Sequence, residues 1–273
     1  MLRHMPVTAM IGLLLTVLFL FCAVFAPWIA PYSMAEVVGN PWEPRSAEAL
    51  LGTDNIGRDL LSRLIYGART TITIAALATI LAFSLGSVLG ILAAVLGGWA
   101  DQLMSRGVDL LMSIPTLIFA LLILSVMPST IAVLVVVMGV LDSTRVYRLA
   151  RAVAVDLNVQ DFVEAARLRG EGRTWIIFRE ILPNALAPLI AELGLRFIFA
   201  VLFLSSLSFL GLGVQPPDAD WGSLVRENRQ GIVFGVPAAL IPAAAIAALA
   251  ISVNLVADWI LKQKTDLKGG RSG

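Results

Sequence analysis

The feature that most constrains the fold is a series of long apolar runs that charged side chains rarely interrupt. The hydrocarbon core of a bilayer is about 30 Å thick, and a helix needs about 20 apolar residues to cross it. Six runs reach or approach this length, at 10–31, 71–97, 108–127, 129–147, 185–213 and 236–261. The sequence therefore predicts an all-α membrane protein with six transmembrane helices.

The composition supports lipid as the main solvent and excludes several classes of function. Of the 273 residues, 58% are hydrophobic and 14% are charged, whereas about 25% are charged in a typical soluble domain. The net charge of +1 creates no field that would attract nucleic acid. The sequence holds one cysteine, Cys22, and one histidine, His4, too few for a metal centre built from these residues. A membrane enzyme with a histidine-activated nucleophile is equally disfavoured.

The distribution of basic residues predicts the orientation in the membrane. Arginine and lysine are concentrated in the loop between the fourth and fifth runs and in the C-terminal tail, and such residues mark the cytoplasmic side. Both termini are therefore expected in the cytoplasm, with the first run kept as a span. The predicted organisation is a cytoplasmic N-terminus at 1–9, a first transmembrane helix at 10–31, a periplasmic segment with an interfacial helix at 32–70, a five-helix core at 71–262, and a cytoplasmic tail at 263–273.

The long loop at about 148–184 reads as two short helices that meet at Gly170. Helix-forming residues that include Glu164, Ala165 and Ala166 end at this glycine, which is a common helix stop. An amphipathic pattern follows, and Pro183 is expected to break the helix before the fifth span. The residues alone allow two interpretations, a compact knob that enters a partner's groove or an amphipathic helix on the membrane surface.

The segment before the second run carries a cluster of charged residues. Asp54 can cap a helix that follows Gly57 and Arg58, and Asp59 and Arg63 are spaced to pair on one helix turn. Neighbouring leucines predict that this helix lies in the membrane interface. Structural anchoring is the favoured role, and closing the outer mouth or meeting a partner is the alternative.

Two charged residues interrupt the fifth run. Each costs about 2.5–3.5 kcal/mol at the centre of a bilayer, and Glu192 and Arg196 are four positions apart, so we expect them to pair and to face the bundle interior. They either line a solute path or hold helices together. Near the end of this run, Phe209, Leu210 and Leu212 form an apolar outer gate or contact lipid and neighbouring helices.

Three segments resemble one family of transport proteins, the ABC importer permeases of the oligopeptide, dipeptide and nickel branch. Glu164, Ala165, Ala166, Gly170, Ile181, Leu182 and Pro183 resemble the "EAA" loop of ABC importer permeases. The run LGTDNIGRDLLSRLIYGAR at 51–69 resembles the outer segment of the subunit type with a short N-terminus. LSFLGLG at 207–213, with the QPP and WG that follow, is also similar to that branch.

The resemblance implies a type I ABC importer permease in a bacterial inner membrane. Its expected partners are a second homologous permease, two ATPase subunits, and a periplasmic or lipid-anchored solute-binding protein. The loop would dock on an ATPase, with Ala165, Ala166 and Gly170 in close contact and Glu164 fixing the loop through hydrogen bonds.

The same resemblance bears on chemistry and cargo. The sequence has no phosphate-binding loop, so it is expected to be no enzyme and to hold no cofactor, with ATP and magnesium bound by the partners. Di- or oligopeptides are the expected cargo, and nickel chelates or opines are the alternatives. A stand-alone channel or secondary carrier is a different class, which needs no arginine-rich docking loop.

Overall fold

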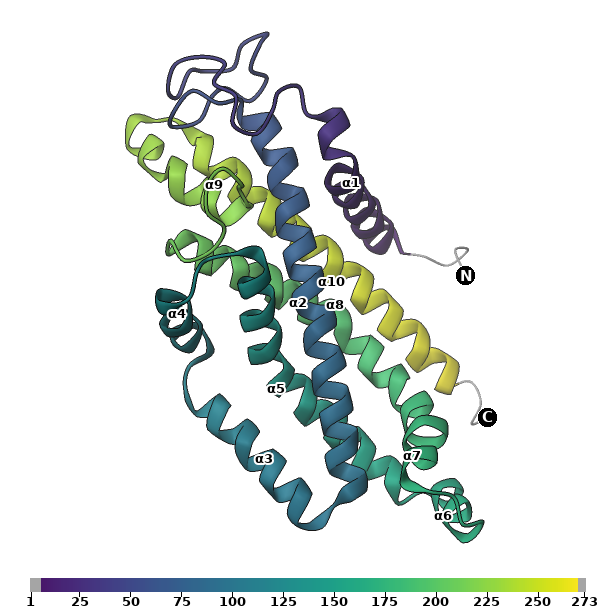
Figure 1. Cartoon of the computed structure of the whole chain (residues 1–273). Helices are drawn as coiled ribbons and strands as arrows, with labels where there is room; N and C mark the ends of the chain where they lie inside the picture. The colour runs from purple at the N-terminus through teal and green to yellow at the C-terminus, as the bar shows by residue number, and fades with distance from the viewer. Residues whose placement is uncertain (1–5, 270–273) are drawn as a thin grey trace. The chain divides into compact units, whose positions relative to one another are not determined.

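The computed structural model describes the backbone of residues 6–269 and the side chains of residues 6–260, and it is helical without strands over this range (Figure 1). Its elements are α1 (Val7–Ile29), α2 (Leu60–Leu96), α3 (Gly98–Ser113), α4 (Thr116–Val126), α5 (Ile131–Asn158), α6 (Asp161–Leu168), α7 (Arg173–Trp175), the π-helix η2 (Ile176–Ile181), α8 (Leu182–Phe209), α9 (Trp221–Asn228), the 3₁₀ turns η3 (Arg229–Phe234) and η4 (Pro237–Ala239), and α10 (Leu240–Gly269). The all-α prediction is confirmed. The predicted N-terminus at 1–9 and tail at 263–273 lie partly outside the described residues.

Most of the predicted spans correspond to helices that suit a bilayer. Among the described residues, four helical segments are long and apolar enough to cross one, namely Val7–Ile29, Leu60–Leu96, Arg173–Phe209 and Pro237–Ile260. The pair α3 and α4 adds a fifth if it counts as one bent span. Helix α5 has 28 residues, which is long enough, but it carries charged side chains from Asp142 onward. The helices are therefore consistent with six spans.

The third predicted span, at 108–127, is wrong as a single straight helix. Helices α3 and α4 meet at an angle of 83°, a bend that is visible in Figure 1. The break falls at Ile114, which has the extended backbone angles φ −95° and ψ 131°. The next residue is Pro115, and a proline disfavours helical angles in the residue before it. A proline in the middle of the apolar run thus divides it.

The predicted interfacial helix near 54–69 does not exist as a separate element. Helix α2 begins at Leu60 and continues for 37 residues, so the polar residues up to Arg69 form its first turns. At 1.5 Å per residue this helix is about 55 Å long, longer than the 30 Å hydrocarbon core. The polar start therefore extends the second span and does not precede it.

The chain divides into two compact units, each described by itself. The first comprises residues up to Ala76, Leu124–Leu134, and the residues from Phe197 onward. In it α1 packs along α10, and a Cβ added to Gly12 would lie 2.8 Å from Leu255 Cβ. The buried Trp221 of α9 donates from Nε1 to the Leu64 carbonyl of α2 at 2.9 Å. This tryptophan joins α9 to the start of α2.

The second unit comprises Leu77–Ile123 and Val135–Arg196. Within it α2 and α5 approach so closely that their backbones touch. A Cβ added to Gly86 would lie 2.6 Å from the Ser143 carbonyl oxygen, and one added to Gly90 would lie 2.6 Å from the Tyr147 carbonyl oxygen. Small residues permit such contact between helices in lipid. The GxxxG spacing of these two glycines therefore marks a helix interface inside the unit.

Candidate functional site

The loop between α5 and α8 folds into short helices that meet at Gly170, as predicted. Gly170 N–H donates to the Arg167 carbonyl at 2.9 Å, and Glu171 N–H donates to the Ala166 carbonyl at 3.2 Å. This pair of bonds is the Schellman motif that ends many helices. Gly170 has a φ of +84°, and a Cβ there would meet nothing within 4 Å. The positive φ therefore favours glycine at this position. Crowding does not, because the surrounding chain leaves room for a side chain.

The inner face of α6 is packed against its own chain. Val163 and Ala166 are fully buried in a cluster that includes Ile91, Ala94, Ala150, Ala154, Ile176, Ile181, Ala185 and Leu189. The structure therefore corrects the prediction that Ala165 and Ala166 both present a contact surface. Ala166 is turned into the core, and only Ala165 is exposed. The buried alanine fixes α6 onto α2, α5 and α8.

The outer face of α6 is open. We call Glu164, Ala165 and Leu168 the α6 surface, because all three are exposed and the Leu168 side chain is 84% exposed. Glu164 and Leu168 also line a hollow of about 430 Å³. The Glu164 carboxylate has no hydrogen bond among the described residues, so it does not fix the loop in the way the sequence suggested. Arg167 does so, donating from Nη2 to Asn158 Oδ1 at 2.6 Å.

The expectation that Pro183 breaks the helix is wrong. The π-helix η2 runs without interruption into α8, in which Pro183 is the second residue. Leu182 N–H donates to the carbonyl of Ile177, five residues earlier. A proline lacks the N–H that an α-helical turn would use, and the π-turn lies directly before it. Ile181 is buried beneath this turn.

Three side chains connect the two halves of the loop. The Arg169 guanidinium lies over the Trp175 ring at 5.7 Å from its centroid, and its Nη2 lies 3.7 Å from Glu180 Oε1. Both contacts run between the end of α6 and the α7–η2 segment. They join the residues before the Gly170 turn to those after it, and Trp175 also packs against the buried cluster.

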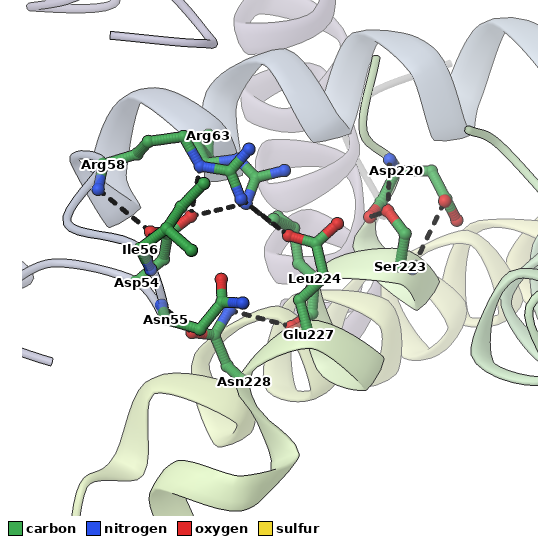
Figure 2. A network of polar contacts seen from close by, with 10 residues as sticks. All are labelled: Asp54, Asn55, Ile56, Arg58, Arg63, Asp220, Ser223, Leu224, Glu227 and Asn228. Atoms are coloured by element: carbon green, nitrogen blue, oxygen red, sulfur yellow. Dashed lines mark hydrogen bonds and ion pairs between the residues drawn. The ribbon is translucent and has the colours of Figure 1, made fainter. Parts of the chain in front are cut away.

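A second polar site lies where the segment before α2 meets α9 (Figure 2). Asp54 accepts hydrogen bonds at Oδ1 from the N–H groups of Ile56 and Arg58, at 3.0 and 2.9 Å. Its Oδ2 lies 2.7 Å from Arg58 Nε and 2.6 Å from Arg63 Nη1. Glu227 Oε2 accepts from Arg58 Nη2 and Arg63 Nη1, at 2.9 and 2.6 Å. We call Asp54, Arg58, Arg63 and Glu227 the outer ion cluster, in which two positive and two negative charges balance.

The predicted roles of Asp54 and Asp59 are exchanged in the structure. Asp54 is a centre of the ion cluster and does not cap α2. Asp59, the residue before the helix, accepts at Oδ2 from the N–H and hydroxyl of Ser62, at 2.8 and 2.6 Å. The predicted pair of Asp59 with Arg63 is replaced by the pair of Arg63 with Asp54. Gly57 makes the turn between them, with φ +86° and no room for a side chain, because its Cβ would collide with the Gly39 carbonyl.

The α9 half of this site was not predicted from the sequence. It consists of Glu227 and of Asn228, whose Oδ1 accepts from the Asn55 N–H at 3.1 Å. A signal was present, because Asp220 and Ser223 form a capping box, which is a recognisable helix start. That signal predicts the short helix α9 but not its partner in the segment before α2.

Burial and hydrogen bonding act differently on two carboxyl groups here. Burial raises the pKa of Asp54, but the N–H donors of Arg58 and Ile56 and the charges of Arg63 and Arg58 outweigh it and hold the pKa below its ordinary value. At Asp220 burial dominates and raises the pKa, although hydroxyl and backbone donors oppose it. Asp54 is therefore held as an anion, and Asp220 is held toward its neutral form.

The two charged residues in α8 form the predicted pair. Arg196 Nη2 contacts Glu192 Oε1 one turn away, and both side chains are largely covered. Arg196 Nη1 also lies 3.8 Å from Asp142 Oδ1 on α5, and Asp142 lies 3.6 Å from Arg145 Nη1. The contact of Arg196 with Asp142 links α5 to α8.

The predicted gate residues lie at and just beyond the end of α8. Phe209 is the last residue of the helix, and its side chain and that of Leu210 are exposed. Leu212 is half-buried in the turn that follows. Their exposure fits either a gate or a contact with lipid. In the described part of the chain, no group of three or more histidine, cysteine or acidic residues is arranged to hold a metal ion.

Two family models match the sequence. Residues 86–264 match the binding-protein-dependent transport system inner membrane component. Residues 7–42 match the N-terminal TM domain of oligopeptide transport permease C. The first match includes the whole loop with its α6 surface, and the second includes α1.

Curated relatives align over nearly the whole chain. It is 37% identical to the di/tripeptide transport system permease protein DppC of Pseudomonas aeruginosa, over 91% of this chain and 84% of that protein. It is 33% identical to the dipeptide transport system permease protein DppC of Alkalihalophilus pseudofirmus, over 92% and 83%. It is 37% identical to the protein of the same name in Escherichia coli K12, over 92% and 86%.

Proposed function

Because this chain belongs to the family of binding-protein-dependent transport system inner membrane components, we propose that it carries short peptides, as one of two permease subunits of an ABC importer. Membership makes it a membrane-spanning transport component. The observation that supports peptide cargo is the alignment of nearly the whole chain with permeases named for dipeptides and di/tripeptides. Both termini lie in the cytoplasm in this proposal, as the distribution of basic residues favours.

The proposed partners are a second homologous permease, two ATPase subunits and a solute-binding protein. ATP and magnesium bind to the ATPase subunits. The α6 surface is the part of this chain that an ATPase grips, since it offers an exposed leucine at the tip of a loop whose inner face is anchored in the core. A rigid attachment of this kind transmits movement of a partner to α5 and α8.

The charged pair of α8 supports a narrower proposal. Glu192 and Arg196 line the solute path, and Phe209, Leu210 and Leu212 form its outer gate. Two observations support this role for the pair. Both side chains are largely buried, and Arg196 has a second acidic neighbour, Asp142. A charged pair inside a membrane bundle is a functional candidate because it is costly to keep there.

The function is tested by purification and reconstitution of the assembled transporter. The chain is expected to co-purify with ATPase subunits, and proteoliposomes should take up dialanine only with ATP and the binding protein. Leu168→Glu should release the ATPase subunits, because the leucine is 84% exposed and is therefore available to a partner. Leu50→Glu, at an exposed leucine before α2, is the matched control and should retain them. Uptake without any ATPase would identify a channel or secondary carrier, and uptake of nickel chelates or opines alone would exclude peptide cargo.

A further inference from the structure

A cavity of about 520 Å³ lies in the first unit beside the N-terminal part of α2. Its walls come from α2, from the segment that follows α1, from the start of α5 and from the loop that precedes α9. The volume falls within the range of small-ligand sites, about 300–1,000 Å³. The cavity is distinct from the outer ion cluster, because none of the four cluster residues lines it.

Two opposite charges line this cavity, Arg69 from α2 and Asp218 from the loop before α9. Both residues are exposed, and in the part of the chain that the structure describes neither side chain has an ion-pair partner. Arg63, less than two turns earlier on the same helix, by contrast already pairs through Nη1 with Asp54 and Glu227. The arginine and the carboxylate of the cavity thus remain available to a ligand.

The rest of the lining combines hydroxyl groups with apolar side chains. Tyr66, Thr70 and Ile74 come from successive turns of α2, and Ile74 is buried. The Thr70 hydroxyl is already bonded to the Tyr66 carbonyl at 3.3 Å. A site with two separate opposite charges, a phenol and an apolar surface suits a small molecule that carries both charges and a modest side chain.

We propose that this cavity is a subsite for short zwitterionic peptides. Arg69 binds the terminal carboxylate, because a guanidinium can donate two parallel hydrogen bonds to it. Asp218 accepts hydrogen bonds from the terminal ammonium group. The assignment rests on the peptide cargo of the proposed function, and it adds a contact made by the permease itself to the selection made by the binding protein.

Protection of an introduced cysteine tests the subsite directly. Because Cys22 is the only native cysteine of this chain, Cys22→Ala allows a single introduced cysteine to be labelled in the assembled transporter without its binding protein, with the label measured on this chain after its subunits are separated. Ala35→Cys places a thiol at an exposed position of the cavity wall, and Glu48→Cys places one at an exposed position outside it. Trialanine should slow maleimide labelling at Ala35→Cys and leave Glu48→Cys unchanged, whereas acetylated and amidated trialanine should protect neither.

The charges are tested by neutral substitutions of similar size. Arg69→Gln and Asp218→Asn should each raise the trialanine concentration that half-protects Ala35→Cys about tenfold, the effect of losing a hydrogen bond to a charged group. Equal labelling with and without trialanine, in a complex that still performs ATP-driven peptide uptake, would overturn the subsite and leave the proposed function intact. Protection by lysophosphatidylethanolamine and not by trialanine would assign the cavity to lipid. A wild-type complex without uptake would overturn the function and the subsite together.

Discussion

The Nη1 atom of Arg63 lies 2.6 Å from Oε2 of Glu227, a residue 164 positions later in the chain. The Arg63 side chain is 1% exposed and that of Glu227 is 14% exposed, so water screens the pair little. The contact connects the first turn of α2 to the last turn of α9. Buried pairs of this kind do not by themselves make a protein more stable, but breaking one leaves an uncompensated charge.

We predict that Arg63→Met strongly lowers the stability of the assembled transporter. Removal of the arginine leaves Asp54 and Glu227 to share Arg58, and breaking a buried pair costs about 3–5 kcal/mol. The apparent unfolding temperature in detergent is the measurement. Arg148→Met is the matched control, because its pair with Asp109 is more than half exposed and such pairs contribute about 0–1 kcal/mol. Equal losses in the two variants would contradict a special role for the buried pair.

The stability of the transporter should depend on the protonation of Asp54 at acid pH. Its pKa in the folded state lies below the ordinary value of 3.8, so the ionised group stabilises the fold above that value. This contribution is lost as the pH falls from 3.8 through the folded pKa. Asp54→Asn should therefore be less stable than the wild type at neutral pH, with a difference that narrows below pH 3.8. The measurement is the unfolding temperature as a function of pH.

Asp220 is the control for Asp54, because the pKa of Asp220 is shifted in the opposite direction. Burial raises its pKa above 3.8, so its contribution is present below that value and is lost as the pH rises through the folded pKa. The difference between wild type and Asp220→Asn should shift in favour of the variant as the pH rises. Parallel pH profiles for the two asparagine variants would show that the environments of the two carboxyl groups do not differ in this way.

Substitutions at Gly170 should separate backbone strain from contact with a partner. Alanine and tryptophan both carry a Cβ into a left-handed conformation, which costs about 1–2 kcal/mol, and the chain itself leaves the Cβ free. We expect Gly170→Trp to reduce peptide uptake per ATP hydrolysed much more than Gly170→Ala, because the ring meets the ATPase. Gly170→Asn should be the mildest, since asparagine tolerates this conformation. Equal coupling in the alanine and tryptophan variants would exclude a close contact at this position.

Gly86→Ala should weaken the packing of α2 against α5. The added methyl group would lie 2.6 Å from the Ser143 carbonyl, and backbone in a close helix contact cannot move aside cheaply. Overpacking of this kind typically costs about 1–3 kcal/mol. Gly107→Ala is the control, because its Cβ would meet nothing within 4 Å and alanine favours a helix over glycine by about 1 kcal/mol. The unfolding temperature should fall for the first variant and stay or rise for the second.

The effect of replacing Arg196 in α8 should depend on its two acidic neighbours, Glu192 and Asp142. Arg196→Met leaves Glu192 and Asp142 near each other without the arginine between them, so less protein should assemble in the membrane. A triple variant that also carries Glu192→Gln and Asp142→Asn should assemble better than the single variant, because no uncompensated acid remains. Uptake by the triple variant then tests the solute path. Full uptake of every peptide would leave these residues only a structural role.

Features that depend on neighbours in sequence could be predicted. The turn at Gly170 follows from a glycine at the end of a helical pattern, and the pair of Glu192 with Arg196 follows from a spacing of four. The division at Pro115 was also visible in principle, since the residue before a proline resists helical angles. The apolar residues on both sides of Pro115 instead favoured one continuous span.

Features that depend on contacts between distant segments could not be predicted from the sequence. Glu227 and Asn228 have no local pattern that indicates Arg63 or Asn55 as partners, which lie more than 160 positions away. Ala165 and Ala166 are chemically identical, so only the packing of α6 decides which one is buried. The role of Pro183 depended on a π-turn, which the sequence pattern does not distinguish from an α-helical one.

The length of α2 has a consequence for the choice of host membrane. From Thr70 to Leu96 it carries no charged side chain, and this stretch is about 40 Å long, whereas bilayer cores average about 30 Å. A thicker or thinner bilayer can therefore be matched by a change of tilt without drawing Arg63 or Arg69 into hydrocarbon. Activity should vary little between proteoliposomes made with shorter and longer acyl chains, which would let such a transporter work in hosts with different lipids.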